Sequence, residues 1–453
     1  MKDLLAGILP KNDPADPAPF SWSRAVRVSL PFFALTLFWQ SYDYTVPLML
    51  SEHFKLGTIR YAAVMSVDNV IALIFLPLFG ILSDRLGGRL GRRTPLILLG
   101  TAGGVIGLLF MRLFDGRTAA GESAFFGFFL ALLFTVFFMN LFRAPSAALI
   151  ADCFVRPQRT RANAILNLMG ALASVVFGLV GRKLIRERYG VTLFTDCMLF
   201  VAVGVAAAVL AYLALVRENR CVSEAEELNR ALGLIDEKTD PSDRTRTRLT
   251  GGERKSLACI LLATFCVYTA YNGFNTHYTN YLVRYLRQPA SWMGPYLLEV
   301  ILATLMMLPA AFVTSRLGRK KSSLVGSALC VLGYSGASLV TPRWPQLLYL
   351  WFVIAAVGFP LIGINLGPMV LELGKDRDSG RFMSYYYVAT TAAQIIIPTL
   401  ASLFINAGGY RVIGVYGGFF NLLAFLCCLL ARHGDVKPAL ASAVEDALTD
   451  DDP

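Results

Sequence analysis

The feature that most constrains this chain is a series of long apolar runs, broken only by short polar joints. A run of about 20 apolar residues is what an α-helix needs to cross the hydrocarbon core of a bilayer. Of the 453 residues, 55% are hydrophobic and 16% are charged, whereas a soluble domain carries about a quarter charged residues. The sequence therefore predicts an all-α protein that crosses a membrane many times, and it excludes an ordinary soluble fold.

Twelve segments are long enough to span the membrane. They cover residues 26–50, 60–83, 94–113, 125–150, 163–181, 193–216, 257–283, 292–315, 321–341, 346–372, 382–406 and 411–432. These segments predict two six-helix bundles, 25–216 and 257–432, joined by a polar linker at 217–256. Residues 1–24 lack the apolar core of a signal peptide, so we expect an N-terminal tail there. An acidic C-terminal tail is expected at 433–453.

The basic residues indicate how the helices are oriented. With twelve spans, alternate joints lie on one side, and cytoplasmic joints are enriched in lysine and arginine. We expect both termini and the linker in the cytoplasm, with the protein in the plasma membrane. Four residues on the opposite side run against this bias: Arg182, Lys183, Arg186 and Arg188. The joints that support the assignment contain Arg85, Arg89, Arg92 and Arg93; Arg156, Arg159 and Arg161; Arg316, Arg319, Lys320 and Lys321; and Lys375, Arg377 and Arg381.

An internal repeat supports two related halves. The segment GILSDRLGGRLGRRTPLIL at 80–98 has a shortened echo, FVTSRLGRKKSSLV, at 312–325. Both copies follow the second helix of their half, and repeated halves around a midplane site are common in secondary transporters. The first copy resembles the loop signature of the major facilitator superfamily, and the residues that carry the resemblance are Gly80, Asp84, Arg85, Gly87, Gly91, Arg92 and Arg93. The resemblance implies the major facilitator fold with its two pseudo-symmetric bundles.

The signature also predicts a gate. An acid and several arginines at a helix end can latch one half to the other through charge pairs and helix dipoles, and Asp152 is a further acid for this gate. Glu372 and its neighbours are the corresponding candidates in the second half. The alternative is that these residues form only a positively charged cytoplasmic joint.

Three further stretches resemble the glycoside-pentoside-hexuronide:cation symporter group, in particular its sucrose-transporter-like branch. They are Asp68-Asn69 followed by PLFGILSDR and GRRTP, NLFRAP at 140–145 leading to Asp152, and RANAILNLMG at 161–170. The resemblance implies uptake of a glycoside with a proton or a sodium ion. Melibiose-type members have an acidic pair on the second helix, where this chain has Ala72 and Leu76. We therefore expect H⁺ as the coupling ion, with Na⁺ as the alternative, and no cofactor.

Ionisable side chains within membrane helices are costly and usually functional. The candidates for proton coupling are Asp43, Asp68, Arg143 and Glu299. Trp39, Gln40 and Asp43 recur at spacings of three and four, which places them on one helix face. An aromatic ring, an amide and a carboxylate on one stripe suit a sugar. The alternative for each acid is a structural ion pair, with Arg143 as the natural counter-ion and Asn140 one turn before it.

The seventh segment has an unusually polar face. Tyr271, Asn272, Asn275 and Tyr278 recur there at helical spacing, and Tyr387 and Gln394 repeat the pattern more weakly on the eleventh segment. Amides and phenols hydrogen-bond without ionising, so we interpret both faces as substrate-binding walls. The alternative is hydrogen bonding between helices.

The sequence as a whole predicts a secondary active transporter of a glycoside or disaccharide such as sucrose or maltose, working by alternating access. The alternatives are another substrate class, namely a lipid, a drug or an organic cation, or sodium-coupled sugar symport. An enzyme is not expected, because the chain has only three histidines and its sequence contains neither a His/Asp/Glu metal cluster nor a nucleophile motif. The sequence also has no phosphate-cradling GxxxxGK[ST] loop, which argues against ATP-driven pumping. We expect a monomer in the lipid bilayer with a small-molecule substrate and no nucleic-acid partner.

Overall fold

A computed structural model of the chain describes residues 20–115, 121–188, 191–231, 249–373 and 379–435. Twelve long helices are present, at the predicted places. The first six are α3 (Leu30–Leu48), α4 (Thr58–Arg85), α5 (Thr94–Arg112), α6 (Gly121–Cys153), α7 (Arg156–Val176) and α9 (Thr195–Leu215). The second six are α11 (Gly251–Asn280), α12 (Gly294–Leu317), α13 (Arg319–Ala337), α14 (Leu347–Leu371), α15 (Ser379–Gly408) and α16 (Val412–Leu430). The predicted all-α membrane fold is confirmed.

Ten helical segments in the described part of the chain are long and apolar enough to cross a membrane. The other two long helices are α3 and α13. Polar residues make these two helices less apolar than the ten segments. Helix α3 carries Gln40 and Asp43, and α13 begins with Arg319, Lys320 and Lys321. Both are nonetheless integral to the bundles, since α3 packs on α7 and α9, and α13 packs on α14 and α16.

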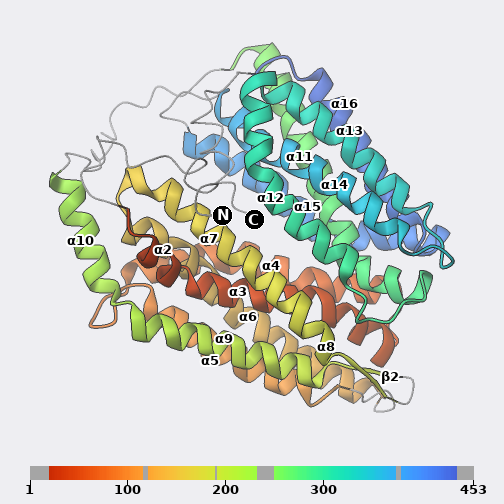
Figure 1. Cartoon of the computed structure of the whole chain (residues 1–453), viewed down its shortest axis with the longest axis horizontal. Coiled ribbons are helices and arrows are strands. Elements are labelled where there is room, and N and C mark those ends of the chain that lie inside the picture. The colour runs from red at the N-terminus through yellow and green to blue at the C-terminus, as the bar shows by residue number, and fades with distance from the viewer. Residues whose placement is uncertain (1–19, 116–120, 189–190, 232–248, 374–378, 436–453) are drawn as a thin grey trace.

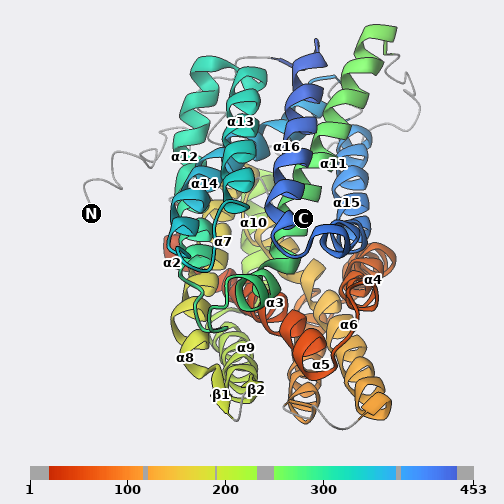
Figure 2. The ribbon, with the colours of Figure 1, turned by 90° about the vertical axis from the view of Figure 1, so that its right-hand side faces the viewer.

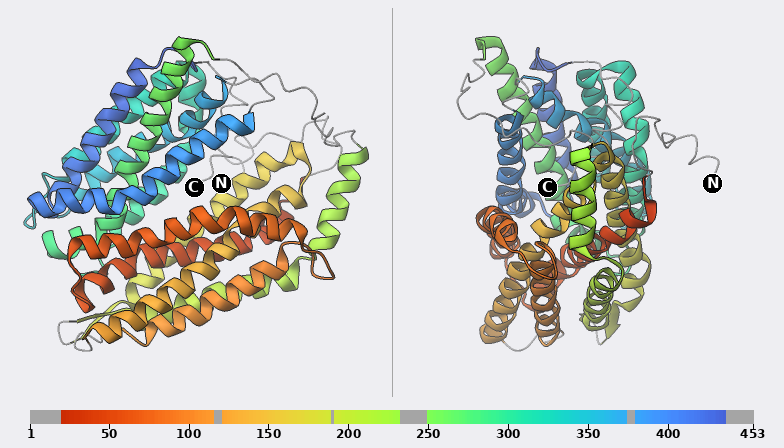
Figure 3. Two further views of the ribbon diagram at one scale, coloured as in Figure 1. Left: turned by 180° about the vertical axis from the view of Figure 1, so that it is seen from behind. Right: turned by 90° about the vertical axis from the view of Figure 1, so that its left-hand side faces the viewer.

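The helices form two bundles that meet along one side and diverge towards the other (Figure 1). In the side view the bundle from α11 to α16 lies above the bundle from α3 to α9 (Figure 2). The contacts between the two bundles include those of α15 with α4, α11 with α3, and α12 with α7. The wedge between the bundles is widest near α10 (Glu218–Ala231), as the view from behind also shows (Figure 3).

The two ends of the molecule carry different minor elements. A short hairpin, β1 (Arg186–Arg188) paired antiparallel with β2 (Val191–Leu193), lies at the end where the bundles meet, together with α8 (Arg182–Leu184). We call this the hairpin end, and the end with α10 the linker end. The π-helical turns η1 (Met49–His53), η2 (Phe177–Gly181) and η3 (Tyr281–Tyr285) extend α3, α7 and α11 towards the hairpin end.

Within each bundle, a glycine allows two neighbouring helices to pack closely, and the helix pair is the equivalent one in both bundles. A Cβ atom at Gly100 of α5 would lie 2.8 Å from the carbonyl oxygen of Phe138 on α6. A Cβ at Gly326 of α13 would lie 2.6 Å from the carbonyl oxygen of Gly358 on α14. Small residues allow such close backbone approach in membranes. The same packing recurs in both halves, as the internal repeat predicts.

Part of the predicted linker, residues 217–256, is ordered against the first bundle. Within it, α10 packs on α6 and buries Ala225, while residues 232–248 lie outside the described part. A short helix, α2 (Trp22–Val28), precedes α3, and Arg24 on it forms an ion pair with Glu224 on α10. Neither short helix is predicted from the sequence. Residues 1–19 and 436–453 of the expected tails lie outside the described residues.

Candidate transport site

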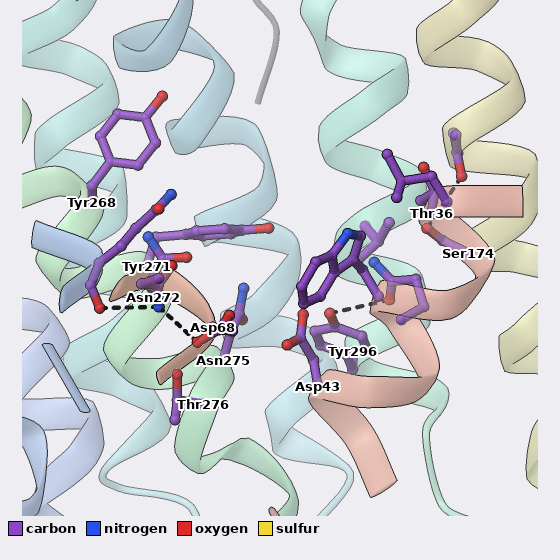
Figure 4. Close-up of a pocket in the computed structure, with 18 of the residues that line it drawn as sticks. Thr36, Asp43, Asp68, Ser174, Tyr268, Tyr271, Asn272, Asn275, Thr276 and Tyr296 are labelled. Carbon is purple, nitrogen blue, oxygen red and sulfur yellow. Dashed lines mark hydrogen bonds between the residues drawn. The ribbon is translucent and has the colours of Figure 1, made fainter. Parts of the chain in front are cut away.

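A cavity of about 320 Å³ lies between the two bundles. Both halves contribute to it, through α3, α4, α6 and α7 on one side and α11, α12 and α15 on the other (Figure 4). Among the predicted site residues, those that line the cavity are Trp39, Gln40, Asp43, Asp68, Arg143, Tyr271, Asn272, Asn275 and Gln394. The structure therefore brings together residues that lie up to 355 positions apart in the sequence.

The α3 wall presents the predicted stripe. Because the spacing of three and four residues is helical, Trp39, Gln40 and Asp43 face the same cavity. The Trp39 ring is held edge-on between Phe38 and Tyr42, at centroid distances of 5.1 and 5.3 Å. Its buried Nε1–H finds no hydrogen-bond partner among the described residues.

Two carboxylates and one guanidinium share the cavity. Asp43 on α3 is exposed to the open space, Asp68 on α4 is half-buried, and Arg143 comes from α6. Each carboxylate lies within range of the Arg143 charge. The Asn69 amide donates to Asp68 Oδ1 at 3.1 Å and to the Gln394 carbonyl oxygen at 3.4 Å. This amide therefore connects the acidic wall to α15 of the other half.

The α11 wall presents phenols and amides. The Tyr271 ring stacks on Phe359 with centroids 4.4 Å apart, and the Tyr268 hydroxyl bonds that of Tyr386 at 3.1 Å. Asn272 and Asn275 lie between these rings and the hairpin end, and Asn272 has a buried Nδ2 without a hydrogen-bond partner in the described structure. These groups can bind a polar solute without a net charge.

Four predicted residues lie away from the cavity. Asn140 is fully buried and donates to the Val136 carbonyl oxygen at 3.0 Å. Tyr278 is 1% exposed and stacks on Tyr296. Tyr387, on the outer side of α15, is 48% exposed. Glu299 is 5% exposed and accepts a hydrogen bond from the Tyr334 hydroxyl at 3.4 Å, inside the second bundle.

Tyr296 is the main site residue that the sequence reasoning missed. Its hydroxyl donates to Gln40 Oε1 at 3.3 Å and so joins the two halves across the cavity. A signal was present, because Tyr296, Val300, Thr304 and Met307 all line the cavity at helical spacing on α12. Only the neighbouring acid, Glu299, was singled out.

Contacts between the halves close the cavity towards the hairpin end. Ser51 Oγ donates to Asn280 Oδ1, and the Arg284 guanidinium donates to the Ser51 carbonyl oxygen, both at 2.6 Å. The Tyr61 hydroxyl donates to the Thr276 carbonyl oxygen at 2.5 Å, and Tyr44 donates to that of Ala290. We call Ser51, Tyr61, Asn280 and Arg284 the hairpin-end gate. The bundles diverge at the linker end (Figures 1 and 3).

The signature loop is tied to its own half. Asp152 on α6 pairs with Arg93 at 2.7 Å and Arg92 at 3.3 Å. The Glu218 carboxylate of α10 accepts hydrogen bonds from the backbone N–H groups of Arg92, Arg93 and Thr94 at 2.7–2.8 Å. This carboxylate therefore lies at the positive end of the α5 dipole.

The backbone favours glycine at two positions of this loop, because Gly88 and Gly91 both have a positive φ, and at Gly91 the space is restricted as well. Gly91 has φ +100°, and a Cβ there would lie 2.3 Å from the Glu218 carboxyl carbon. A Cβ at Gly80 or Gly87 would meet nothing within 4 Å. Asp84 and Arg85 end α4, and their side chains lie outside the described part of the structure.

The second half repeats this arrangement. Arg319 at the start of α13 pairs with Glu372 at the end of α14, at 2.8 Å. These pairs differ from the predicted latch, because both partners of each pair belong to the same bundle. The bundles diverge at the linker end, and there the described pairs of Arg92, Arg93 and Arg319 each form within one half.

Comparison with known proteins decides the family. The family model of the Major Facilitator Superfamily matches residues 28–298 and 260–448 of this chain. The chain belongs to the major facilitator superfamily. It is a multi-pass membrane transporter and not an enzyme. No curated protein matches the sequence, and the glycoside branch within the superfamily is not confirmed.

Solved structures show the same fold at low identity. A crystal structure of the peptide transporter POT in complex with sulfate has a TM-score of 0.65 at 15% identity, covering 95% of this chain and 98% of that chain. A mutant of the nucleoside transporter NupG has a TM-score of 0.67 at 15% identity, covering 90% and 100%. Tetrameric PepTSo2 has a TM-score of 0.63 at 16% identity, covering 90% and 96%. These likenesses support the fold, and they leave the substrate open.

Proposed function

We propose that this transporter is a symporter that moves a neutral glycoside or disaccharide, such as sucrose or maltose, together with a proton by alternating access. The observation that carries the proposal is the composition of the cavity. Two carboxylates and an arginine lie on one wall, and phenols and amides lie on the other. No cofactor is needed for such a cycle.

A glycoside suits the chemistry and size of this cavity. Its volume of about 320 Å³ lies at the small end of ligand pockets. The Trp39 and Tyr271 rings offer apolar faces to a sugar ring, since aromatic side chains combine apolar area with a polar edge. The unpartnered donors Trp39 Nε1 and Asn272 Nδ2 require acceptors, and sugar hydroxyls supply them.

Proton coupling follows from the shared charges. Arg143 provides one positive charge for two carboxylates, Asp43 and Asp68, so the cavity has an excess of negative charge unless a cation binds. A substrate whose hydroxyls engage the Arg143 guanidinium would leave one carboxylate with less compensating charge, and that carboxylate would then bind a proton. Na⁺ remains the alternative, because the same two carboxylates are hard oxygen ligands.

The basic joints support the orientation that we propose. The linker end carries the signature loop, Arg319 and α10, so by the positive-inside bias this end faces the cytoplasm. We place the protein in the plasma membrane as a monomer. With that orientation, the structure has its cavity closed to the outside by the hairpin-end gate. It corresponds to the inward-facing state from which substrate leaves.

A zwitterionic substrate, such as a small peptide, is the second candidate. The cavity contains charges of both signs, Arg143 opposite in sign to Asp43 and Asp68, and peptide transporters share the fold. A lipid, drug or organic cation is less well suited, because the amides and phenols of α11 make the cavity polar.

Equilibrium binding to the purified transporter tests the substrate class. Sucrose, maltose, melibiose, a dipeptide and a nucleoside are titrated by calorimetry against the wild type, Trp39→Phe and Trp344→Phe. We expect saturable binding of one sugar, weakened by Trp39→Phe and unchanged by Trp344→Phe, since Trp344 is 60% exposed in a loop away from the cavity. Binding of only the dipeptide or the nucleoside would overturn the glycoside proposal and leave the family unchanged.

A further inference from the structure

A buried histidine and a buried carboxylate face each other at the hairpin end. His53 is the last residue of the π-helical turn η1, and Asp115 lies just after the end of α5. The His53 Nδ1 and Asp115 Oδ1 atoms are 3.7 Å apart, and neither side chain is exposed to solvent. Neither residue lines the cavity or belongs to the hairpin-end gate. The transport cycle proposed above therefore gives this pair no role.

The second ring nitrogen of His53 determines which tautomer the neutral ring adopts. Its Nε2 atom lies 2.8 Å from the Thr192 carbonyl oxygen on β2. A carbonyl oxygen only accepts hydrogen bonds, so Nε2 carries a hydrogen and donates it. A neutral imidazole has a single N–H group, and its Nδ1 then presents a lone pair to the Asp115 carboxylate. A proton on Nδ1 converts the same contact into an ion pair between an imidazolium and a carboxylate.

Asp115 has one carboxylate oxygen in use and one that faces His53. The Oδ2 atom accepts hydrogen bonds from the backbone N–H groups of Phe194 and Thr195 at 2.7 and 2.5 Å, and from the Thr195 hydroxyl at 2.5 Å. The Oδ1 atom is buried and has no hydrogen-bond partner in the described part of the chain. Buried polar atoms are normally hydrogen-bonded. The Nδ1–H group of a protonated His53 is the donor that Oδ1 lacks.

The other titratable groups on the surrounding elements do not replace Asp115 as the partner of His53. Asp196 of α9 pairs instead with Arg186 of β1 at 3.1 Å. Cys197 of α9 is a buried free thiol, and a thiol in such surroundings stays uncharged. The remaining groups are at least partly exposed, and they are Glu52 on η1, Lys55 after it and Arg112 at the end of α5. Among the described residues, Asp115 is therefore the charge that His53 faces.

The turn that carries His53 also carries a gate residue. Ser51 lies on the same turn, η1, and contacts Asn280 and Arg284 of the other half, both at 2.6 Å. On its other side, His53 ties this turn to the Thr192 carbonyl oxygen of the hairpin and faces Asp115. π-helical turns are rare and often lie at functional sites. The hold on His53 therefore sets how firmly Ser51 is presented to the other half.

We propose that His53 and Asp115 form a proton-binding site, separate from the cavity, that strengthens the hairpin-end gate when it is occupied. The proton binds at Nδ1 and lies between the imidazole and the Asp115 carboxylate. Its loss leaves a lone pair facing a negative charge, which loosens η1 from the hairpin and weakens the contacts of Ser51. Histidine changes its charge between about pH 5 and 8, so the gate responds within this range. The side from which the proton arrives, the outside, rests on the orientation proposed above.

Nuclear magnetic resonance of the purified full-length transporter, with its histidine rings isotope-labelled, tests the proton site. The chain has only three histidines, and the signal that is missing from His53→Gln identifies His53. We expect both His53 nitrogens to be protonated at about pH 5.5 and Nδ1 to have lost its proton at about pH 8. In Asp115→Asn the proton should leave at a pH lower by about one unit, because the carboxylate charge is gone. A wild-type ring that keeps one protonation state throughout, or an unchanged titration in Asp115→Asn, would overturn the inference.

Pulsed electron paramagnetic resonance tests the link to the gate. Spin labels at residues 60 and 287, one in each half, report opening at the hairpin end in protein whose Cys221 and Cys259 are replaced by serine. The fraction of long distances should be about twofold larger at about pH 8 than at about pH 5.5.

The variants separate His53 from the other titrating groups. His53→Gln keeps an N–H donor for the Thr192 carbonyl oxygen but cannot titrate, so most of the pH difference should disappear. His433→Gln is the matched control and should keep the difference, because His433 lies at the linker end beside Ser256. The proposal fails if His53→Gln responds to pH as the wild type does, or if His433→Gln loses the response equally. Elution from size exclusion confirms that each variant folds.

Discussion

At the scale of single residues, the cavity contains polar atoms that have no hydrogen-bond partner in the described part of the chain. Trp39 Nε1 and Asn272 Nδ2 are buried donors on opposite walls, one from each half. A buried donor without an acceptor costs about 1–3 kcal/mol, and this cost is tolerated where a ligand provides the acceptor. We therefore propose these two atoms as hydrogen-bond donors to the substrate.

Asn272→Ala should weaken binding of the substrate by about tenfold, which corresponds to the loss of about 1.4 kcal/mol from one hydrogen bond. The matched control is Asn421→Ala on α16, because Asn421 is also buried but donates to the Gly417 carbonyl oxygen. Calorimetric titration gives both affinities. Equal affinities for the two variants would show that Asn272 does not contact the substrate.

The residue positions that the sequence predicted best are those set by a single helix. The stripe of Trp39, Gln40 and Asp43 depends only on helical periodicity, and the structure places all three in the cavity. Tyr278 and Glu299 follow the same periodicity, yet the packing of α12 and α13 around them keeps them inside the second bundle. Periodicity gives the direction of a side chain, and it does not tell which neighbour that side chain meets.

At the scale of elements, the signature loop and α10 act as one unit. Charge-assisted hydrogen bonds to backbone N–H groups are about twice as strong as neutral ones, and Glu218 makes three of them while 3% exposed. The sequence predicted a charged loop here but paired it with the opposite half. The partner Glu218 follows the sixth apolar run directly, and only the folded chain shows that it reaches back to α5.

Gly91→Ala should destabilise the transporter by about 1–3 kcal/mol, because the new Cβ would meet the Glu218 carboxylate and a positive φ strains any other residue. Gly87→Ala in the same loop should leave stability within about 0.5 kcal/mol, since a Cβ there meets nothing within 4 Å. Thermal unfolding in detergent compares the two. Similar midpoints for both variants would mean that the Glu218 contact does not hold the loop.

At the scale of the whole molecule, the two bundles are related by the internal repeat, which the sequence shows directly. The conformational state cannot be predicted in the same way, because the same sequence adopts every state of the transport cycle. Contacts such as those of Ser51 and Arg284 exist only in the state that is closed at the hairpin end. No pattern within either segment shows that they pair, so the state could not be predicted from the sequence.

Arg284→Ala should shift the population towards the state that is open at the hairpin end. Pulsed electron paramagnetic resonance measures this shift as the distribution of distances between spin labels at residues 60 and 287. Cys221 and Cys259 are replaced by serine in all samples so that they do not take up the label. We expect a larger fraction of long distances than in the labelled protein that keeps Arg284. Arg411→Ala is the control, since Arg411 donates to Ser338 within one bundle. An unchanged distance distribution in Arg284→Ala would contradict the role of the hairpin-end gate.

Gradient-driven uptake into proteoliposomes tests whether the carboxylates of the cavity couple proton movement to substrate transport. Under an imposed pH gradient, wild type should accumulate the glycoside above its external concentration. Asp43→Asn should abolish accumulation and keep exchange of labelled for unlabelled substrate, because the cavity still binds while the proton site is lost. Accumulation by Asp43→Asn equal to that of the wild type, or accumulation that requires a sodium gradient, would contradict the account.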